Sequence, residues 1–381
     1  MDAHCWKTVL NKMDYDTQVS MIMVIGDLKL RNIIETTTLS DGFQYAINFN
    51  QLRTMNLKFQ HKMETKIDFS KFDCPNLTTI CASNVGISNL YRMASITYLD
   101  CYDCDIAMIS LHKYPLLNVI KLHDCKIDKI LIGKNECLRE INWNKFDAKY
   151  LAFMATECPN VEKLIIYDCR NINNIRFKVR KFKHLKEFEC NAGFFDFSEM
   201  HKLKSLMRLK IYDEVIVDVS QLTWLTHFDC GSSFGFIGIE CLKNLICLGC
   251  TYYEGTIDVS GMQQLEKLDC YKCFEIKGLE KLENLTSLDC AECEGIHSFA
   301  KLTKLRELTC GGQDEYMLKK DGGVKYDGFE NLLNMRYMVC MNVLTHIDVS
   351  KMKKIKSLQY VGVHFFDNSD KLPENATICE F

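Results

Sequence analysis

A period of 20 residues runs through most of the chain and limits what it can fold into. The segments LTHFDC, LICLGC, LEKLDC, LTSLDC and LRELTC begin at residues 225, 245, 265, 285 and 305. Weaker copies of the same frame reach back to LRTMNL, which ends at Leu57, and forward to IKSLQY, which ends at Tyr360, for about 15 units in all. A fixed period of this length indicates one small structural unit stacked on itself, because each unit buries its apolar face against its neighbours.

Each unit predicts a short strand followed by a return segment. In L-x-x-L-x-C, apolar and polar residues alternate, which is typical of a strand with one face directed inward. The return segment FEIKGLEKLENL places Ile276, Leu279 and Leu282 in the same core. This pattern is the leucine-rich repeat consensus, and the chain resembles that family over roughly residues 45–365. Units that read I-D-V-S before the strand, with cysteine in the last strand position, resemble the cysteine-ladder subtype of bacterial internalin-like proteins.

The resemblance implies an α/β solenoid with a curved parallel β-sheet of about 15 short strands. We assign residues 1–44 to a small helical N-terminal cap and residues 45–381 to the solenoid, with an enlarged repeat at 311–334. There, 30 residues instead of 20 separate Cys310 from Cys340, and the extra residues are rich in glycine. We expect a loop, and a binding role and a plain spacer are both open for it.

Four cysteines match the spacing of a zinc ribbon. They form C-x2-C-x16-C-x2-C, with Cys270, Cys273, Cys290 and Cys293 as its members. The inward strand position of Cys270 and Cys290 holds leucine or isoleucine in other units, and cysteine recurs there in eight units. Because that position needs only a medium-sized apolar side chain, we expect a packed column of reduced cysteines and assign no metal and no cofactor.

The first 44 residues do not follow the repeat and have helical spacing. Trp6, Val9, Leu10 and Met13 follow an i, i+3, i+4, i+7 pattern, and Val19 begins a later apolar series. The segment CWKTVLNKMDYDTQVSMIMVIGDLKLRNII resembles an F-box, and the resemblance implies that these five residues dock to a Skp-type adaptor of a ubiquitin ligase. The alternative is a cap alone, because every solenoid must cover its first open core. Both interpretations stay open.

Strand positions that point away from the core supply the candidate partner-binding residues. Tyrosine or histidine often follows the inward position, an aspartate comes next in the first half of the chain, and a further row of aspartates precedes the inward position. Tyrosine provides a large contact area and carboxylates attract basic groups, so we expect the concave face to bind a protein or a peptide, with a basic partner favoured. The predicted residues are Tyr102, Asp103, His123, Asp124, Tyr167, Asp168, Tyr212, Asp213, Asp269 and Tyr271.

Composition and motifs favour a binding protein over an enzyme. The 381 residues include 47 basic and 50 acidic side chains, a balance that gives no general attraction to nucleic acid or to an anionic membrane. The sequence contains no H-E-x-x-H, no nucleophile elbow and no phosphate-binding loop. The first residues lack the pattern of a secretory signal, so the 21 cysteines indicate a reducing, cytoplasmic location.

We therefore predict a non-enzymatic scaffold for protein recognition. One alternative is a substrate adaptor of a ubiquitin ligase, which depends on the F-box resemblance of residues 1–44. The other is a structural or interaction protein with leucine-rich repeats and no ligase link, encoded by a host, a virus or a parasite.

Overall fold

The computed structural model describes most of the chain after residue 52. The described residues are 36–39, 53–58, 66–71, 74–145, 150–168, 177–191, 195–212, 216–231, 235–312, 324–361 and 366–380. The chain divides into two compact units, Met1–Phe188 and Glu189–Phe381, and each is described by itself. Within the described ranges, no helix has the length and apolar character needed to cross a membrane.

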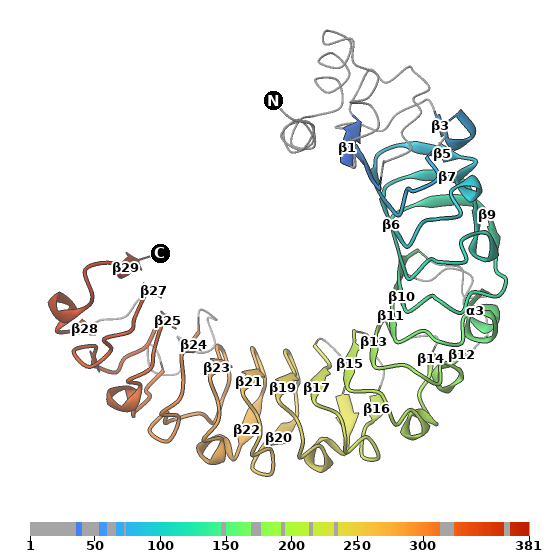
Figure 1. Ribbon diagram of the computed structural model, residues 1–381. Helices are drawn as coiled ribbons and strands as arrows, with labels where there is room; N and C mark the ends of the chain where they lie inside the picture. The colour runs from blue at the N-terminus through green and yellow to red at the C-terminus, as the bar shows by residue number, and fades with distance from the viewer. Residues whose placement is uncertain are drawn as a thin grey trace, which may run out of the picture. The chain divides into compact units, whose positions relative to one another are not determined.

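Short parallel strands pair side by side to form the main sheet of the first unit (Figure 1). The strands are, in order, β1 (Thr36–Leu39), β2 (Thr54–Lys58), β4 (Thr79–Ser83), β6 (Tyr98–Tyr102), β8 (Val119–His123), β10 (Glu140–Asn144) and β11 (Lys163–Tyr167). Register is kept from strand to strand, so that Ile120 pairs with both Leu99 and Ile141. The ladder begins with β1, which lies inside the segment 1–44 that we assigned to a helical cap; residues 1–35 lie outside the described ranges.

The main sheet of the second unit has the same parallel arrangement (Figure 1). Its strands are β15 (Arg208–Ile211), β17 (His227–Asp229), β19 (Cys247–Gly249), β21 (Lys267–Asp269), β23 (Ser287–Asp289), β24 (Glu307–Gly311), β25 (Tyr337–Met341), β27 (Ser357–Val361) and β29 (Thr377–Glu380). The 30-residue interval does not interrupt the ladder, because Cys310 pairs with Cys340. These two ladders confirm the predicted parallel sheet.

A second set of strands lies on the outer side of the bend in each unit (Figure 1). In the first unit, β3 (Lys66–Asp68), β5 (Gly86–Ser88), β7 (Asp105–Ser110) and β9 (Lys126–Leu131) form one parallel sheet. In the second unit the outer strands pair two by two: β16 (Ile216–Asp218) with β18 (Gly235–Ile237), β20 (Thr256–Asp258) with β22 (Glu275–Lys277), and β26 (Ile347–Asp348) with β28 (Phe366–Asp367). The described chain also includes β12 (Phe177–Lys178), β13 (Glu187–Cys190) and β14 (Phe195–Asp196).

Most return segments end in a single turn of 3₁₀ helix. These turns are η2 (Phe69–Lys71), η3 (Leu90–Arg92), η4 (Leu111–Lys113), η6 (Val179–Lys181), η8 (Met200–Lys202), η9 (Ile239–Cys241), η10 (Leu279–Lys281), η11 (Phe329–Asn331) and η12 (Ser369–Lys371). One α-helix, α3 (Leu151–Glu157), lies in the longer interval between β10 and β11, and the sequence analysis did not predict it.

The outer segments of the second unit alternate between two kinds. In the first kind, I-D-V-S, the aspartate accepts a hydrogen bond from the serine backbone; Ser260 N lies 2.9 Å from Asp258 Oδ1. The second kind has glycine in a left-handed conformation, as at Gly278 with φ of 81°. A Cβ added at Gly278 would lie 2.5 Å from the Cβ of Ser260, so only glycine fits against the preceding serine. The matching pairs of segments contain Ser220 with Gly238, Ser260 with Gly278, and Ala300 with Gly328.

Alternation along each main strand buries one set of side chains and exposes the other. In β21, Leu268 is buried while Lys267 and Asp269 are exposed. Leu248 and Leu288 occupy the buried position of the neighbouring strands. Burying one such leucine stabilises the fold by about 1.5–3 kcal/mol. The exposed set lines the inner side of the bend, and we call it the concave face of its unit (Figure 1).

Asparagines hold successive return segments together at the start of the main strands. Asn244 Nδ2 donates to the carbonyl of Thr223 at 2.8 Å, and Asn284 Nδ2 donates to the carbonyl of Gln263 at 2.9 Å. Such bonds satisfy backbone oxygens that the stacked strands leave without a partner. They also fix the positions of β19 and β23, which carry part of the surface described next.

Candidate functional site

The inward cysteines form a column beneath the main sheet of the second unit. The thiols of Cys230, Cys250, Cys270 and Cys290 donate to carbonyls of the following strand, for example Cys270 Sγ to Asp289 O at 3.2 Å. Cys310 Sγ instead lies 3.7 Å from Cys340 Sγ. Burial raises the pKa of the Cys290 thiol well above its usual range, which keeps this donor protonated at neutral pH. The column contains Cys230, Cys250, Cys270, Cys290, Cys310 and Cys340, all buried. The predicted column of cysteines is confirmed.

The cysteines with zinc-like spacing have separate backbone acceptors. Cys273 Sγ donates to the carbonyl of Cys250 at 2.6 Å, and Cys293 Sγ donates to the carbonyl of Cys270. In the parts of the chain that the structure describes, no group of three or more His, Cys, Asp or Glu side chains is arranged to hold a metal ion. Cys273 and Cys293 thus occupy a second structural position of the repeat, three residues after the inward one.

On the first unit, predicted binding residues meet in a row at the ends of the main strands. Tyr102 of β6 pairs in register with His123 of β8, and Asn144 of β10 pairs with Tyr167 of β11. Tyr102 is 54% exposed. Neighbouring strands lie about 4.8 Å apart, so these side chains form one continuous surface.

The aspartates that follow this row occupy a turn with a special backbone conformation. Asp103, Asp124 and Asp168 have φ of 48°, 55° and 49°. Lys145 holds the same position with φ of 57°, so the left-handed conformation belongs to the repeat and does not depend on aspartate. Asp and Asn tolerate it better than most residues, which explains their frequency there. Asp124 is also paired within the chain, with Oδ1 2.6 Å from Lys145 Nζ.

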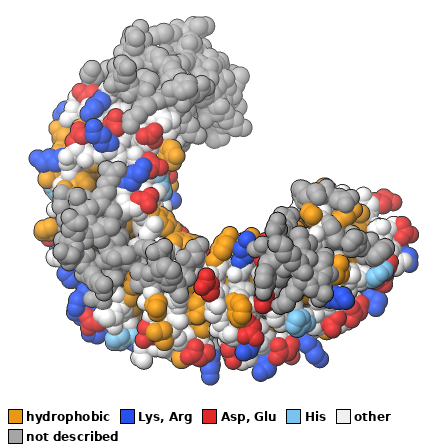
Figure 2. Space-filling model, turned by 180° about the vertical axis from the view of Figure 1, so that it is seen from behind, with side chains coloured by type: hydrophobic (Ala, Val, Ile, Leu, Met, Phe, Trp, Pro, Cys, Tyr) orange, Lys and Arg blue, Asp and Glu red, His pale blue; other side chains and the backbone are white. Residues whose placement is uncertain are grey.

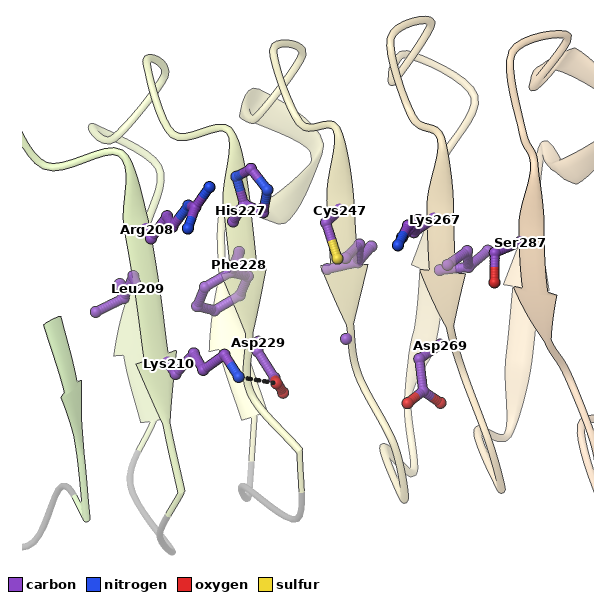
Figure 3. A pocket seen from close by; sticks show the side chains of 13 residues that line it. Arg208, Leu209, Lys210, His227, Phe228, Asp229, Cys247, Lys267, Asp269 and Ser287 are labelled. Atoms are coloured by element: carbon purple, nitrogen blue, oxygen red, sulfur yellow. Dashed lines mark ion pairs between the residues drawn. The ribbon is translucent and has the colours of Figure 1, made fainter. Parts of the chain in front are cut away.

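On the second unit, the concave face contains a hollow of about 310 Å³ centred on β19 (Figure 3). The two outward positions of β19 hold small residues, Cys247 and Gly249. The flanking strands carry long or charged side chains at the same positions, so a depression remains between them. Its lining extends from β15 to Ser287 on β23.

Two rows of side chains cross this hollow (Figure 3). The first row contains Arg208, His227, Cys247, Lys267 and Ser287, and the second row contains Lys210, Asp229, Gly249 and Asp269. Asp289 on β23 pairs with Asp269 and continues the second row beyond the lining of the hollow. The rows are two residues apart along each strand, a separation of about 6–7 Å. Lys210 and Asp229 of the second row form an ion pair with each other. Apart from this pair, the cations Arg208 and Lys267 lie in the first row and the carboxylates lie in the second.

Asp229 is held firmly at the side of the hollow. Its Oδ2 lies 3.7 Å from Lys210 Nζ and accepts a hydrogen bond from the Tyr212 hydroxyl at 3.2 Å. Its Oδ1 accepts a hydrogen bond from Gly231 N at 3.1 Å. A Cβ on Gly249 would lie only 2.8 Å from the same oxygen, which is too close. The missing side chain at Gly249 therefore makes room for the Asp229 carboxylate as well as for the hollow.

The remaining carboxylates of the second row have less support. Asp269 Oδ1 accepts from Tyr271 N at 3.3 Å, and Asp289 Oδ1 accepts from Ala291 N at 3.2 Å. Partial burial raises the pKa of Asp289 to about 6 despite that hydrogen bond, and the adjacent Asp269 adds to the increase. Loss of solvent and the neighbouring carboxylate thus outweigh the single backbone hydrogen bond.

Solved structures with the same arrangement identify the fold. The functional domain of InlJ from Listeria monocytogenes, which includes a cysteine ladder, matches 92% of this chain and 74% of its own length, with a TM-score of 0.54 and 19% identity. A leucine-rich repeat protein of Leptospira interrogans matches 92% of this chain and 91% of its own length, with a TM-score of 0.59 and 13% identity. An internalin of Listeria monocytogenes, InlF, matches 86% of this chain and 96% of its own length, with a TM-score of 0.53 and 14% identity. This chain has the leucine-rich repeat fold. No protein-family model and no curated protein matches the sequence.

The predicted binding residues are divided between the two units of the chain. Tyr102, Asp103, His123, Asp124, Tyr167 and Asp168 belong to the first unit, and Tyr212, Asp269 and Tyr271 belong to the second. Asp213 and the predicted adaptor-docking residues Trp6, Val9, Leu10, Met13 and Val19 lie outside the described residues.

Among the predicted residues of the second unit, two tyrosines already have partners in the repeat array. Tyr212 donates to Asp229, and the Tyr271 ring lies 5.4 Å from Tyr252 and 5.5 Å from Lys272 Nζ. Sequence reasoning missed Cys247 and Gly249, whose signal was two small outward residues in LICLGC beside charged ones in the adjacent units.

Proposed function

We propose that this protein is a non-enzymatic recognition scaffold that binds a partner protein or peptide on its concave face. The observation that carries the proposal is the ordered display of exposed side chains on the parallel strands of each unit. Rigid strands hold these side chains in place, so a partner loses little of their conformational entropy on binding. The hollow over β19 supplies shape in addition to charge.

Charge distribution supports a protein or peptide over nucleic acid. The chain carries a formal charge of −3. Acidic and basic side chains alternate over the outer surface of the second unit in the view of Figure 2, without a large patch of one sign. Binding to a phosphate backbone depends on such a basic patch.

Photo-crosslinking from defined positions tests the proposal. A photoreactive amino acid replaces Tyr102 or Cys247 on the concave faces, or Ile237 on the outer side of the second unit as a matched control. Ile237 is 58% exposed and Tyr102 is 54% exposed, so access is comparable. In cells that express the protein, we expect the same partner to crosslink from a concave position and not from Ile237. Crosslinks from Ile237 alone would contradict a concave site.

The ligase-adaptor form of this function depends on residues 1–44. Its support is the resemblance of that segment to an F-box. A pull-down with a Skp-type adaptor compares the full chain with a Trp6→Ala/Leu10→Ala variant and with a chain lacking residues 1–35, which keeps β1. Retention of the adaptor by the full chain alone supports this form, and no retention by any of the three leaves a recognition scaffold without a ligase link.

The free thiols support a reducing location for the scaffold. The described cysteines form no disulfide bonds, and Cys250 and Cys270 of the ladder donate hydrogen bonds to backbone carbonyls. Oxidation would remove these donors and enlarge the sulfur groups in a packed core. A cytoplasmic location is therefore part of the proposal.

A further inference from the structure

The charges around the hollow are unevenly satisfied. Asp229 has a cation and a hydroxyl as partners. Within the described ranges, Lys267, Asp269 and Asp289 form no ion pair. Lys267 and Asp269 line the hollow, and Asp289 lies beside Asp269 on the next strand. One cation and two carboxylates are thus available on the side of the hollow toward β23.

The spacing of these charges limits what can satisfy them together. Lys267 and Asp269 lie two residues apart on one face of β21, so their backbone positions are about 6–7 Å apart. Asp269 and Asp289 are in register on adjacent strands, about 4.8 Å apart, a distance at which one guanidinium or ammonium group can contact both. A free amino acid carries its ammonium and carboxylate on the same carbon and is too short for both rows. A chain segment with charges on two side chains spans them.

We propose that the hollow over β19 binds a segment of the partner that carries one basic and one acidic side chain. The basic group lies between Asp269 and Asp289, and the acidic group faces Lys267 in the first row. The rest of the segment lies over Cys247 and Gly249, where the surface has no side chain large enough to exclude it. This inference rests on the proposed recognition function and adds to it the site and the chemistry of the partner.

The size of the hollow agrees with this occupant. Its volume of about 310 Å³ holds one or two side chains with their backbone and not a folded domain. Opposite charges in two rows also select the direction of the segment, because reversing it would bring like charges together.

A random library of twelve-residue peptides displayed on phage, selected against the full chain, tests the inference. We expect the enriched peptides to share one Lys or Arg and one Asp or Glu. Synthetic versions should bind at least about tenfold more weakly to Asp269→Asn/Asp289→Asn, which removes the pair of carboxylates, and to Cys247→Leu, which fills the hollow. Lys267→Gln should also weaken their binding, because it removes the cation that faces their acidic residue.

Matched variants separate these effects from general damage. Ser357→Leu places the same side chain in the first-row position of β27, and Glu280→Gln removes an exposed carboxylate from η10 on the outer side. Both should bind within about twofold of the unaltered chain, and thermal unfolding shows whether each variant keeps its fold. Peptides that bind Cys247→Leu or the double Asn variant undiminished overturn the hollow as the site but leave a recognition function in place. A selection that enriches no peptide at all overturns both.

Discussion

Aspartate appears at two places in the repeat, and the two regions use it differently. In the first unit, Asp103 and Asp168 lie in left-handed turns at the ends of the main strands. In the second unit, Asp269 and Asp289 lie on the strands themselves, where extended backbone accepts almost any residue. The left-handed backbone favours aspartate at the turns, whereas the extended backbone of the strands does not. Asp269 and Asp289 each accept one backbone hydrogen bond but form no ion pair within the described residues, which makes them the stronger candidates for binding a basic partner.

The strongest test of backbone control concerns a glycine. Gly278→Ala should lower the free energy of unfolding by about 2–4 kcal/mol, because alanine in a left-handed conformation is strained and its Cβ would meet the backbone of Ser260. Chemical denaturation measures the loss. Gly261→Ala is the matched control, since a Cβ there has no atom within 3.9 Å, and a similar loss in both variants would show that strain is not the cause.

The turn aspartates should respond to side-chain branching and not to charge. Asp168→Val is expected to cost about 1–3 kcal/mol, since a β-branched residue is unfavourable at φ near 49°, whereas Asp168→Asn should stay within about 0.5 kcal/mol. On the strand, Asp269→Val should be equally harmless. Thermal or urea unfolding of the three variants compares the regions directly. Equal costs for the two valine variants would remove the distinction between turn and strand.

Asp289 should make stability depend on pH in a direction unusual for a carboxylate. Its pKa of about 6 exceeds the value of about 3.9 for an unfolded chain, so the folded state binds more protons between pH 4 and pH 6 and loses stability as pH rises through that window. Asp269 on β21 and Thr309 on β24 face it from the adjacent strands.

Asp289→Asn should accordingly stabilise the chain by about 1 kcal/mol at pH 7, after allowance for solvent screening, and by almost nothing at pH 4. Urea unfolding at the two pH values measures this difference. The control is Asp258→Asn, because hydrogen bonds from the Ser260 hydroxyl and backbone N–H lower the pKa of Asp258 and its loss should destabilise the chain at pH 7. A variant of Asp289 that is destabilised at pH 7 would mean that this carboxylate already has a favourable partner.

The smallest effect is expected in the inward column. Cys270→Val keeps the volume and removes one weak S–H donor to Asp289 O, so it should cost up to about 1 kcal/mol. It should leave peptide binding unchanged, because the side chain lies beneath the sheet. Unfolding and peptide affinity, measured on the same preparation, separate the buried column from the face above it. A loss of binding without a loss of stability would connect the two.

Much of the fold could be predicted, because the same pattern of apolar positions occurs in many units, although it is weak in any one of them. The pattern around Leu268 and Cys270 recurs in unit after unit, and each copy demands the same buried positions. The helix α3 had no such repetition and was missed. The start of the sheet was also misplaced, because β1 lies outside the L-x-x-L-x-C frame.

The candidate site was harder to predict, because it depends on differences between neighbouring units. Asp269 and Tyr271 could be assigned to the outward face from alternation alone. The hollow, by contrast, follows from Cys247 and Gly249 being smaller than what flanks them on β17 and β21. Whether an aspartate is paired, as Asp124 is with Lys145, depends on rotamers and register that the repeat pattern does not specify.

Because the outer segments of the second unit alternate between two kinds, its structure repeats every two 20-residue units and not every one. A segment with glycine, such as that of Gly278, fits a preceding segment with a small residue, such as Ser260, and the close approaches of Gly238, Gly278 and Gly328 all join segments of unlike kind. Loss of one 20-residue copy would bring like segments together, whereas loss of two would restore the match. Gene duplication and deletion in this unit are therefore expected to proceed in steps of about 40 residues, and its recognition face would gain or lose strands in pairs.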